Sequence, residues 1–237
     1  TRLDSNTVKF ILEHGEAKLF IYDSDYSPIV EKAFEDLSNP PVLVEFVDKI
    51  AGNTRSKFAD AHNCLDYETE IKKYLDIKLE HSLPSDEWSS IALNYTSGTT
   101  GNPKGVVYHH RGAYLNAIGN ILTWDLPMHP KYLWTLPMFH CNGWCFPWTI
   151  TERAGTHVCL RQLSGELIVK ALQNDNITHL CGAPIVMQMI ADYLLQNDIS
   201  LKTDIKMMTA GAPPPEAVLS KMASCGIDVI HVYGLTE

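Results

Sequence analysis

The chain has 237 residues, of which 45% are hydrophobic and 20% are charged, and this composition predicts a folded protein rather than a disordered one. Acidic residues outnumber basic ones by 28 to 19, and there is no block of Lys or Arg. We therefore expect neither nucleic acid nor an anionic membrane surface as a partner. The most apolar region, residues 133–150, contains a histidine, an asparagine and two prolines, so it predicts no membrane span.

The six cysteines form no C-x-x-C pair and have no histidine cluster that would complete a zinc site. Several lie in apolar stretches, where a free thiol behaves as a small hydrophobic group. We therefore expect reduced cysteines and a cytoplasmic protein.

Hydrophobic periodicity predicts alternating helices and strands from the start of the chain. The expected order is a helix from Asp4 or Ser5 to Gly15, a strand at 18–22, a helix at 28–37 and a strand at 42–47. Residues 48–87 are more charged and less regular, apart from a helix at 67–75, and they indicate a solvated connecting region.

The alternation resumes at Ser89. Strands are expected at 91–95, 105–108, 132–136, 156–160, 178–181, 205–209 and 228–232, and helices at 112–122, 164–173, 184–195 and 214–225. No obvious linker divides the chain, so we treat it as one α/β unit with mixed, largely parallel sheets covered by helices.

A Gly-rich segment, Tyr95-Thr-Ser-Gly-Thr-Thr-Gly-Asn-Pro-Lys104-Gly105, follows the strand at 91–95. Its glycines allow close backbone approach, its hydroxyl groups donate hydrogen bonds, and Lys104 adds a cation, which together suit a polyphosphate. The spacing matches neither a Walker A loop nor a dinucleotide fingerprint. The alternative is an ordinary Ser/Thr/Gly-rich surface turn.

Three further segments stand out, and each also has a plain structural interpretation. Pro137-Met-Phe-His140-Cys-Asn-Gly-Trp144 is aromatic-rich, although a single histidine in such a setting is usually a packed core residue. Ala210-Gly-Ala-Pro-Pro214 follows a predicted strand and could simply begin a helix. Tyr233-Gly-Leu-Thr-Glu237 ends in a carboxylate that suits a hard cation beside phosphate oxygens.

These motifs, in this order, resemble the adenylate-forming (AMP-binding) superfamily over essentially the whole chain. The segments at 105–114 and 132–146 look most like the short- and medium-chain acyl-CoA synthetases, especially methylthiopropionate–CoA ligase and its relatives. The resemblance implies the large N-terminal domain of that fold. We expect residues 1–237 to be a partial AMP-binding domain, without the small C-terminal domain, its catalytic lysine or the ribose-binding aspartate. The start at Thr1 and the stop at Glu237 also lead us to expect a piece of a longer protein.

The resemblance also implies roles for individual residues. It assigns ATP phosphates and adenine to the residues Thr96, Ser97, Gly98, Thr99, Thr100, Gly101, Lys104, Gly211, Ala212, Pro213, Tyr233, Gly234 and Thr236. It gives Lys104, Thr236 and Glu237 catalytic roles, with Glu237 as the Mg²⁺ ligand. It places His140, Trp144 and Gly211 against the acyl group, where a bulky indole suits a compact acid.

The implied activity is ATP-dependent activation of a short- or medium-chain carboxylic acid, possibly methylthiopropionate, followed by thioester formation with CoA. ATP, Mg²⁺, CoA and the acid are the implied cofactors and partners, and a homodimer is left open. Two alternatives remain, an amino-acid adenylation domain and an ATP-binding piece without turnover. His109, His110 and Arg111 could be read as catalytic, but we favour packing at the strand end.

Overall fold

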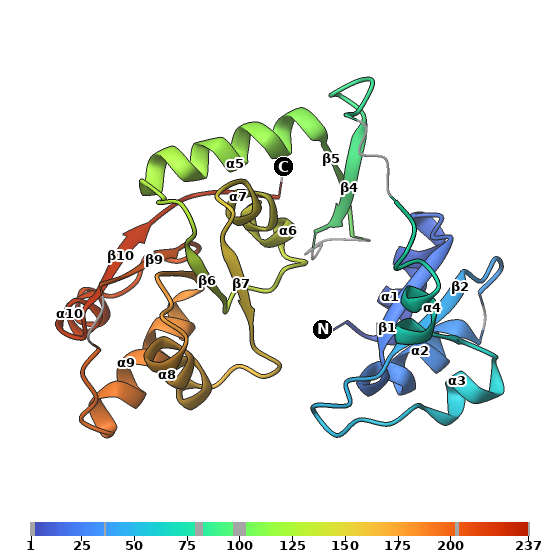
Figure 1. Cartoon of the computed structure of the whole chain (residues 1–237), viewed down its shortest axis with the longest axis horizontal. Coiled ribbons are helices and arrows are strands. Elements are labelled where there is room, and N and C mark those ends of the chain that lie inside the picture. Colours follow the sequence, from blue (N-terminus) through green and yellow to red (C-terminus); the bar gives the residue numbers. More distant parts are fainter. Residues whose placement is uncertain (1–2, 36, 79–82, 97–102, 202–203, 237) are drawn as a thin grey trace. The chain divides into compact units, whose positions relative to one another are not determined.

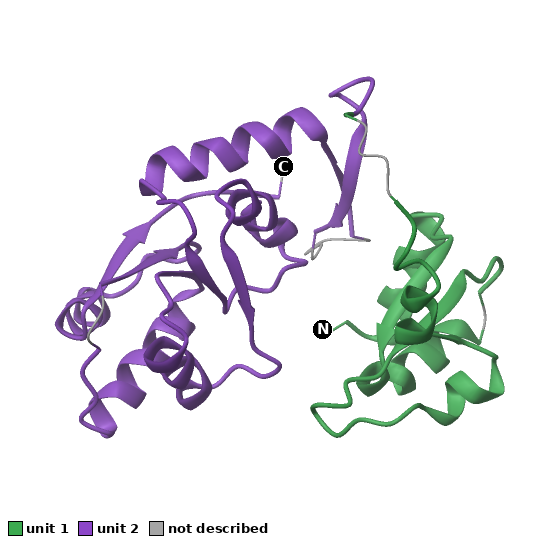
Figure 2. Ribbon diagram, in the orientation of Figure 1, with its two compact units in different colours: residues 1–83 green, residues 84–237 purple. Residues whose placement is uncertain are grey.

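The computed structural model describes residues 3–35, 37–78, 83–96, 103–201 and 204–236. The chain divides into two compact units, residues 1–83 and residues 84–237, shown separately coloured in Figure 2. We had treated the chain as one unit because its sequence shows no obvious linker. The boundary falls inside the charged region 48–87, whose apolar residues Phe58, Ala59 and Cys64 are buried in the core of the first unit.

The first unit is built on a three-stranded parallel sheet in the order β1-β2-β3 (Figure 1). Its strands are β1 (Leu19–Asp23), β2 (Val42–Phe46) and β3 (Leu65–Asp66). Its helices are α1 (Ser5–His14), the 3₁₀ turn η1 (Ser24–Tyr26), α2 (Ser27–Phe34), α3 (Lys57–Ala61) and α4 (Tyr67–Lys72). The β1-α2-β2 alternation predicted from the sequence is confirmed.

The two faces of this sheet differ in what covers them. On one face, a buried cluster packs the sheet against α2 and α3 through Tyr22, Val30, Leu43 and Phe58. The other face, which we call the outer apolar face, is formed by Leu19, Ile21, Val42, Val44 and Leu65, of which Val44 is buried. Leu19, Ile21 and Val42 are each at least half exposed there, at 54%, 50% and 53%.

The second unit contains a five-stranded, fully parallel sheet in the order β10-β9-β8-β6-β7 (Figure 1). Its strands are β6 (Lys131–Trp134), β7 (Thr156–Cys159), β8 (His179–Cys181), β9 (Ile205–Thr209) and β10 (Ile227–His231). A separate antiparallel hairpin precedes it, formed by β4 (Ser90–Tyr95) and β5 (Gly105–His109). The predicted fold class, mixed and largely parallel sheets covered by helices, is confirmed.

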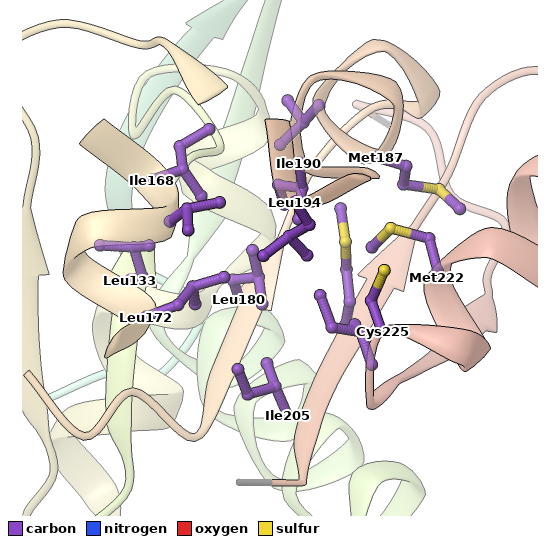
Figure 3. Close-up of a cluster of buried hydrophobic side chains, with 14 of the residues drawn as sticks. Leu133, Ile168, Leu172, Leu180, Met187, Ile190, Leu194, Ile205, Met222 and Cys225 are labelled. Carbon is purple, nitrogen blue, oxygen red and sulfur yellow. The ribbon is translucent and has the colours of Figure 1, made fainter. Parts of the chain in front are cut away.

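Helices cover both faces of the five-stranded sheet, as the alternation of its buried side chains requires. The helices are α5 (His110–Trp124), the short turn α6 (Cys141–Trp144), α7 (Phe146–Glu152), α8 (Gly165–Asn174), α9 (Pro184–Gln196) and α10 (Glu216–Ser224). Leu133, Leu180 and Met207 belong to a core with α8, α9 and α10. Figure 3 shows Leu133 and Leu180 in this core. Their sequence neighbours belong to a second cluster on the opposite face, with α5 and α7.

Local chemistry explains where several helices begin. The side chains of Asp4, Ser56, Asp66 and Ser164 each accept a hydrogen bond from a backbone N–H in the first turn of α1, α3, α4 and α8. In the part of the chain that the structure describes, no helix is both long enough and apolar enough to cross a membrane. All six cysteines are free thiols.

Candidate active site

The strand order of the five-stranded sheet has a reversal at β6. The chain moves from β6 to β7 on one side and then crosses to β8 on the other, so β6 lies between them. In open parallel sheets, ligands bind outside the carboxyl ends of the strands at such a reversal. We call the residues that follow β6, β8, β9 and β10 at this end the carboxyl edge, namely 135–140, 182–183, 210–213 and 232–236.

The ends of β6 and β8 are joined directly at the reversal. The Thr135 hydroxyl donates a 2.7 Å hydrogen bond to the buried carbonyl oxygen of Cys181. After this tie the chain leaves the sheet, and Phe139 and His140 are exposed. His140 therefore lies at the carboxyl edge, and its exposure is not that of the packed core histidine in the alternative interpretation.

The ends of β9 and β10 bring two more of the predicted motifs together. The Val232 N–H donates a 2.8 Å hydrogen bond to the carbonyl oxygen of Thr209, so the segments at 210–213 and 233–236 begin next to each other. Gly211 has a φ of +97°, a conformation that favours glycine, and a Cβ built there would meet no atom within 4 Å. Tyr233 is 87% exposed, so its ring is free to stack on a planar ligand.

Thr236 connects the last motif to the segment after β6. Its hydroxyl lies 3.4 Å from the Cys141 sulfur, and that sulfur lies 4.0 Å from His140 Nε2. Figure 1 shows the segment after β10 running back towards α6. The structure therefore brings together Thr236, His140 and, through the β9–β10 pairing, Gly211.

The turn that carries this contact has an unusual backbone. Cys141, Asn142, Gly143, Trp144 and Cys145 all have positive φ, between +41° and +64°, so we call residues 141–145 the left-handed turn. Its N–H groups bond three residues back, from Gly143 to His140 and from Cys145 to Asn142, at 2.8 and 3.1 Å. Left-handed conformations cost L-residues roughly 1–2 kcal/mol each, so the surrounding contacts must hold this turn in place.

Gly143 allows the left-handed turn to lie directly against the sheet. A Cβ at this position would be 2.7 Å from Cζ3 of the Trp134 ring, closer than real contacts allow. Trp144, the predicted acyl-site residue, is half-buried and packs against the cluster under α5 and α7. Its neighbour Cys145 is buried, and burial raises the pKa of that thiol, so it remains protonated at neutral pH.

The predicted phosphate-gripping loop joins β4 and β5, two antiparallel strands outside the parallel sheet. Thr96 and Lys104 close its base, because the Thr96 N–H donates to the Lys104 carbonyl oxygen at 3.0 Å and the Lys104 N–H donates to Thr96 Oγ1 at 3.3 Å. Lys104 is exposed. The predicted ligands Ser97, Gly98, Thr99, Thr100 and Gly101 lie outside the described residues.

The hydrogen bonds that the structure gives Lys104 connect it to Thr96 and not to the carboxyl edge. The hairpin is connected to that edge through α5, which begins directly after β5. His109 and Arg111 have structural roles there. His109 Nδ1 accepts the Gly112 N–H at 2.9 Å and so caps α5, and Arg111 forms a 2.6 Å ion pair with Glu87. The interpretation as strand-end packing is confirmed for these two residues.

The carboxyl edge has few ionisable side chains. Its described residues include no Asp, Glu, Lys or Arg. Glu237, the predicted metal ligand, lies outside the described residues, and within the described residues no three His, Cys, Asp or Glu side chains are grouped as a metal site. A ligand at this edge would meet hydroxyls, backbone groups and apolar or aromatic surface.

Two features of the edge were missed by sequence reasoning. Gly182 and Ala183 follow β8 at the strand reversal, and the Gly182 N–H donates a 3.0 Å hydrogen bond to the Met208 carbonyl oxygen. The signal was present, because Gly182-Ala-Pro184 repeats the Gly211-Ala-Pro213 motif after a buried strand. The sequence gives no indication that Cys141 approaches Thr236. These residues are far apart in the chain, and the left-handed turn that contains Cys141 has no characteristic sequence pattern.

The fold and the site together define an α/β protein with a ligand site at the carboxyl edge of a parallel sheet and a Gly-rich hairpin preceding it. The comparisons identify the family. The model of the AMP-binding enzyme family matches residues 1–237, so the chain belongs to the AMP-binding enzyme family.

Curated relatives include a 2-methylpropanoate–CoA ligase of Humulus lupulus, 40% identical over 239 residues, and an acetate/butyrate–CoA ligase of Arabidopsis thaliana described as peroxisomal, 38% identical over 244 residues. Both alignments cover 100% of this chain but only 42% and 43% of the relatives. The chain therefore spans less than half the length of these proteins.

Solved structures share the fold. An anthranilate CoA ligase bound to anthranoyl-AMP matches with a TM-score of 0.81 at 20% identity, over 100% of this chain and 44% of that one. The N-terminal domain of FACL13 from Mycobacterium tuberculosis matches with a TM-score of 0.79 at 23% identity, over 100% and 55%. At these identities the likeness supports the arrangement of helices and sheets.

Proposed function

We propose that the protein containing this chain is an AMP-forming carboxylate–CoA ligase. The observation that carries the proposal is the convergence at one carboxyl edge of three motifs from distant parts of the sequence. The 3.4 Å contact between Cys141 and Thr236 and the 2.8 Å bond between Val232 and Thr209 make this convergence. Membership of the AMP-binding family and the names of the relatives support it.

The residues present fit ATP. Lys104 offers an exposed ammonium group at the base of a Gly-rich hairpin, where a triphosphate needs a cation and backbone donors. Tyr233 offers an exposed ring for adenine, and Gly211 and Gly234 offer backbone with open space around the Cα. We assign the loop residues 96–101 and Lys104 to the phosphates, and the segments at 211–213 and 233–236 to the nucleoside and the α-phosphate.

Magnesium is part of this proposal through Glu237. A carboxylate beside phosphate oxygens suits this hard cation, which would supply neutralisation of phosphate charge. The remaining residues perform positioning and charge stabilisation, with Lys104 holding the pyrophosphate end and the Thr236 hydroxyl holding the α-phosphate.

The proposed chemistry has two displacements. A carboxylate oxygen of the acid forms a bond to the α-phosphorus of ATP, and the bond to the leaving pyrophosphate breaks. The thiol of CoA then forms a bond to the acyl carbon and loses its proton, while AMP leaves with the oxygen. Neither step needs a covalent enzyme intermediate.

The side chains of the carboxyl edge indicate which class of acid substrate is favoured. An amino-acid substrate would carry an ammonium group that needs a carboxylate partner, and the described residues of the carboxyl edge include none. We therefore favour an acid with an uncharged, compact acyl group, with methylthiopropionate as one candidate. Relatives named for 2-methylpropanoate and for acetate and butyrate agree with a short acid, although another is named for trans-cinnamate.

The alternatives differ in measurable ways. An amino-acid adenylation domain would support exchange with amino acids rather than simple acids. An ATP-binding piece without turnover describes the 237-residue chain by itself if the missing portion of its relatives supplies essential groups. That piece would bind ATP and form no adenylate when an acid is added.

The deciding experiment is pyrophosphate–ATP exchange by the full-length protein with a panel of acids, including acetate, butyrate, 2-methylpropanoate, methylthiopropionate and several amino acids. We expect exchange with a short acid and its loss in Lys104→Met and Thr236→Val. Thr156→Val, an exposed threonine at the start of β7, is the matched control and should retain exchange. No exchange with any acid would refute the proposal.

We also propose a cytoplasmic location on the basis of the six free thiols, and a homodimer as the assembly to test first. Three of the relatives are named as peroxisomal, so microscopy of a fluorescent fusion should compare the cytoplasm with peroxisomes. Light scattering of the purified protein gives the oligomeric state.

A further inference from the structure

The left-handed turn needs outside contacts to persist, and its two last carbonyl groups receive them from Asn120 of α5 and Thr149 of α7. Asn120 Nδ2 donates a 3.0 Å hydrogen bond to the carbonyl oxygen of Trp144. The same amide nitrogen lies 3.2 Å from the Thr149 hydroxyl, and that hydroxyl donates a 2.9 Å bond to the carbonyl oxygen of Cys145.

The donor and acceptor of each of these hydrogen bonds can be assigned. The carbonyl of Trp144 can only accept, so the amide must present its nitrogen. Since the Thr149 hydrogen is used on Cys145, the Thr149 oxygen accepts from Asn120. Both amide hydrogens of Asn120 are therefore engaged, one directly on the turn and one through Thr149. Thr149 is fully buried and Asn120 is half-buried, so competition from water is reduced.

The position of the turn decides what the carboxyl edge presents. The turn begins with Cys141, whose sulfur touches Thr236, and it follows His140 directly. It ends with Trp144 and Cys145, whose carbonyls Asn120 and Thr149 secure. The Cys145 carbonyl also accepts the Thr149 backbone N–H at 3.0 Å, so the Trp144 carbonyl is the group that depends on Asn120. Its release would allow φ angles to return to negative values and would move His140 and Trp144 relative to Thr236.

We propose that Asn120 is a positioning residue. By holding the left-handed turn, it fixes His140 and Trp144, the proposed acyl-site residues, in place. It need not touch the substrate and acts through Trp144 directly and through Cys145 by way of Thr149. This inference rests on the proposed acid activation, because the residues that Asn120 positions belong to the acyl site of that activity. The proposed activity then depends on a residue of α5, Asn120, that lies in none of the predicted motifs.

The test compares Asn120→Asp, Asn120→Ala and wild type in the full-length protein, by pyrophosphate–ATP exchange. Asp keeps the shape of Asn but has no N–H to donate, so both bonds are lost. We expect the KM for the acid to rise about tenfold, the change that corresponds to one or two lost hydrogen bonds. We expect the KM for ATP to change less than about twofold, and the relative kcat/KM among acids of different length to shift.

Asn197→Asp is the matched control. Asn197 also donates its Nδ2 to a carbonyl oxygen, that of Tyr193 at 2.8 Å, but it lies at the end of α9. We expect its kinetic constants to equal those of wild type. If Asn120→Asp does not fold, the KM values are compared between Asn120→Ala and wild type, because alanine introduces no charge.

The outcomes separate the two proposals. Exchange by wild type with unchanged acid KM and acid preference in the Asn120 variants, whether or not they are less stable, overturns the positioning role alone. An equal rise in both KM values also overturns it, because a general loss of structure would act on both substrates. No exchange by wild type with any acid overturns the proposed function, and this inference with it.

Discussion

His179 provides a sharp test of the second unit because it is a buried histidine without a charged partner that would favour its protonation. It lies on β8 with 3% of its surface exposed, and its ring meets the edge of Trp124 with centroids 4.7 Å apart. Nδ1 lies 2.7 Å from the Thr178 hydroxyl, whereas Nε2 has no hydrogen-bond partner. Burial, with a smaller contribution from the positive charge of Lys206, lowers the pKa of His179 from 6.5 to about 4.

The direction of the pH effect follows from proton binding. Between pH 6.5 and about 4, an unfolded chain binds a proton at His179 that the folded chain does not bind. The free energy of unfolding therefore falls as the pH falls through this window. At 1.36 kcal/mol per pH unit, the full loss attributable to this side chain is about 3 kcal/mol near pH 4, and it is absent above pH 6.5.

The assay is urea unfolding of wild type and His179→Gln from about pH 7 down to about pH 4.5. Glutamine does not titrate, so the variant should lose less stability on acidification, whatever its stability at neutral pH. His129→Gln, an exposed histidine before β6, controls for the loss of one imidazole and should follow the wild-type curve. Curves for wild type and His179→Gln that stay parallel throughout would refute the reasoning.

Three further substitutions test the packing. Gly143→Ala places a Cβ 2.7 Å from the Trp134 ring at a φ of +55°, and should cost about 2–4 kcal/mol in urea unfolding; a change below about 0.5 kcal/mol would contradict the geometry. Glu45→Ala removes a fully buried carboxylate that accepts the Ser56 N–H and lies 3.7 Å from Arg55, and should cost about 3 kcal/mol; an unchanged unfolding midpoint would argue against that pair. Ser164→Ala removes the cap of α8 and should cost about 1 kcal/mol, measured in the same way, with no loss expected for the exposed Ser220→Ala.

Much of the fold could be predicted from the sequence because its signals are local. The helix at 5–14 has an aspartate cap and apolar residues at helical spacing, and the buried strands of the parallel sheet are short apolar runs. The helix at 57–61 was missed because it is short and lies in the charged region. The antiparallel pairing of β4 with β5 was also not foreseen, since strand direction depends on the connection and not on the strand residues themselves.

The candidate site was predictable only as separate motifs. Resemblance supplied Gly211, Tyr233 and Thr236, and the parallel topology explains why segments after different strands meet at one edge. The left-handed turn was not predictable, because four of its five residues are L-residues that disfavour that backbone. Its support comes from Asn120, a residue whose sequence position gives no indication of its partner.

The outer apolar face of the three-stranded sheet has a practical consequence for the purified chain. Leu19, Ile21 and Val42 offer adjoining aliphatic surface to water, and such surfaces promote association between molecules. We expect the 237-residue polypeptide to show concentration-dependent light scattering, which would be reduced by Ile21→Lys. Binding measurements on this polypeptide should accordingly be made across a dilution series, so that self-association is not mistaken for weak ligand affinity.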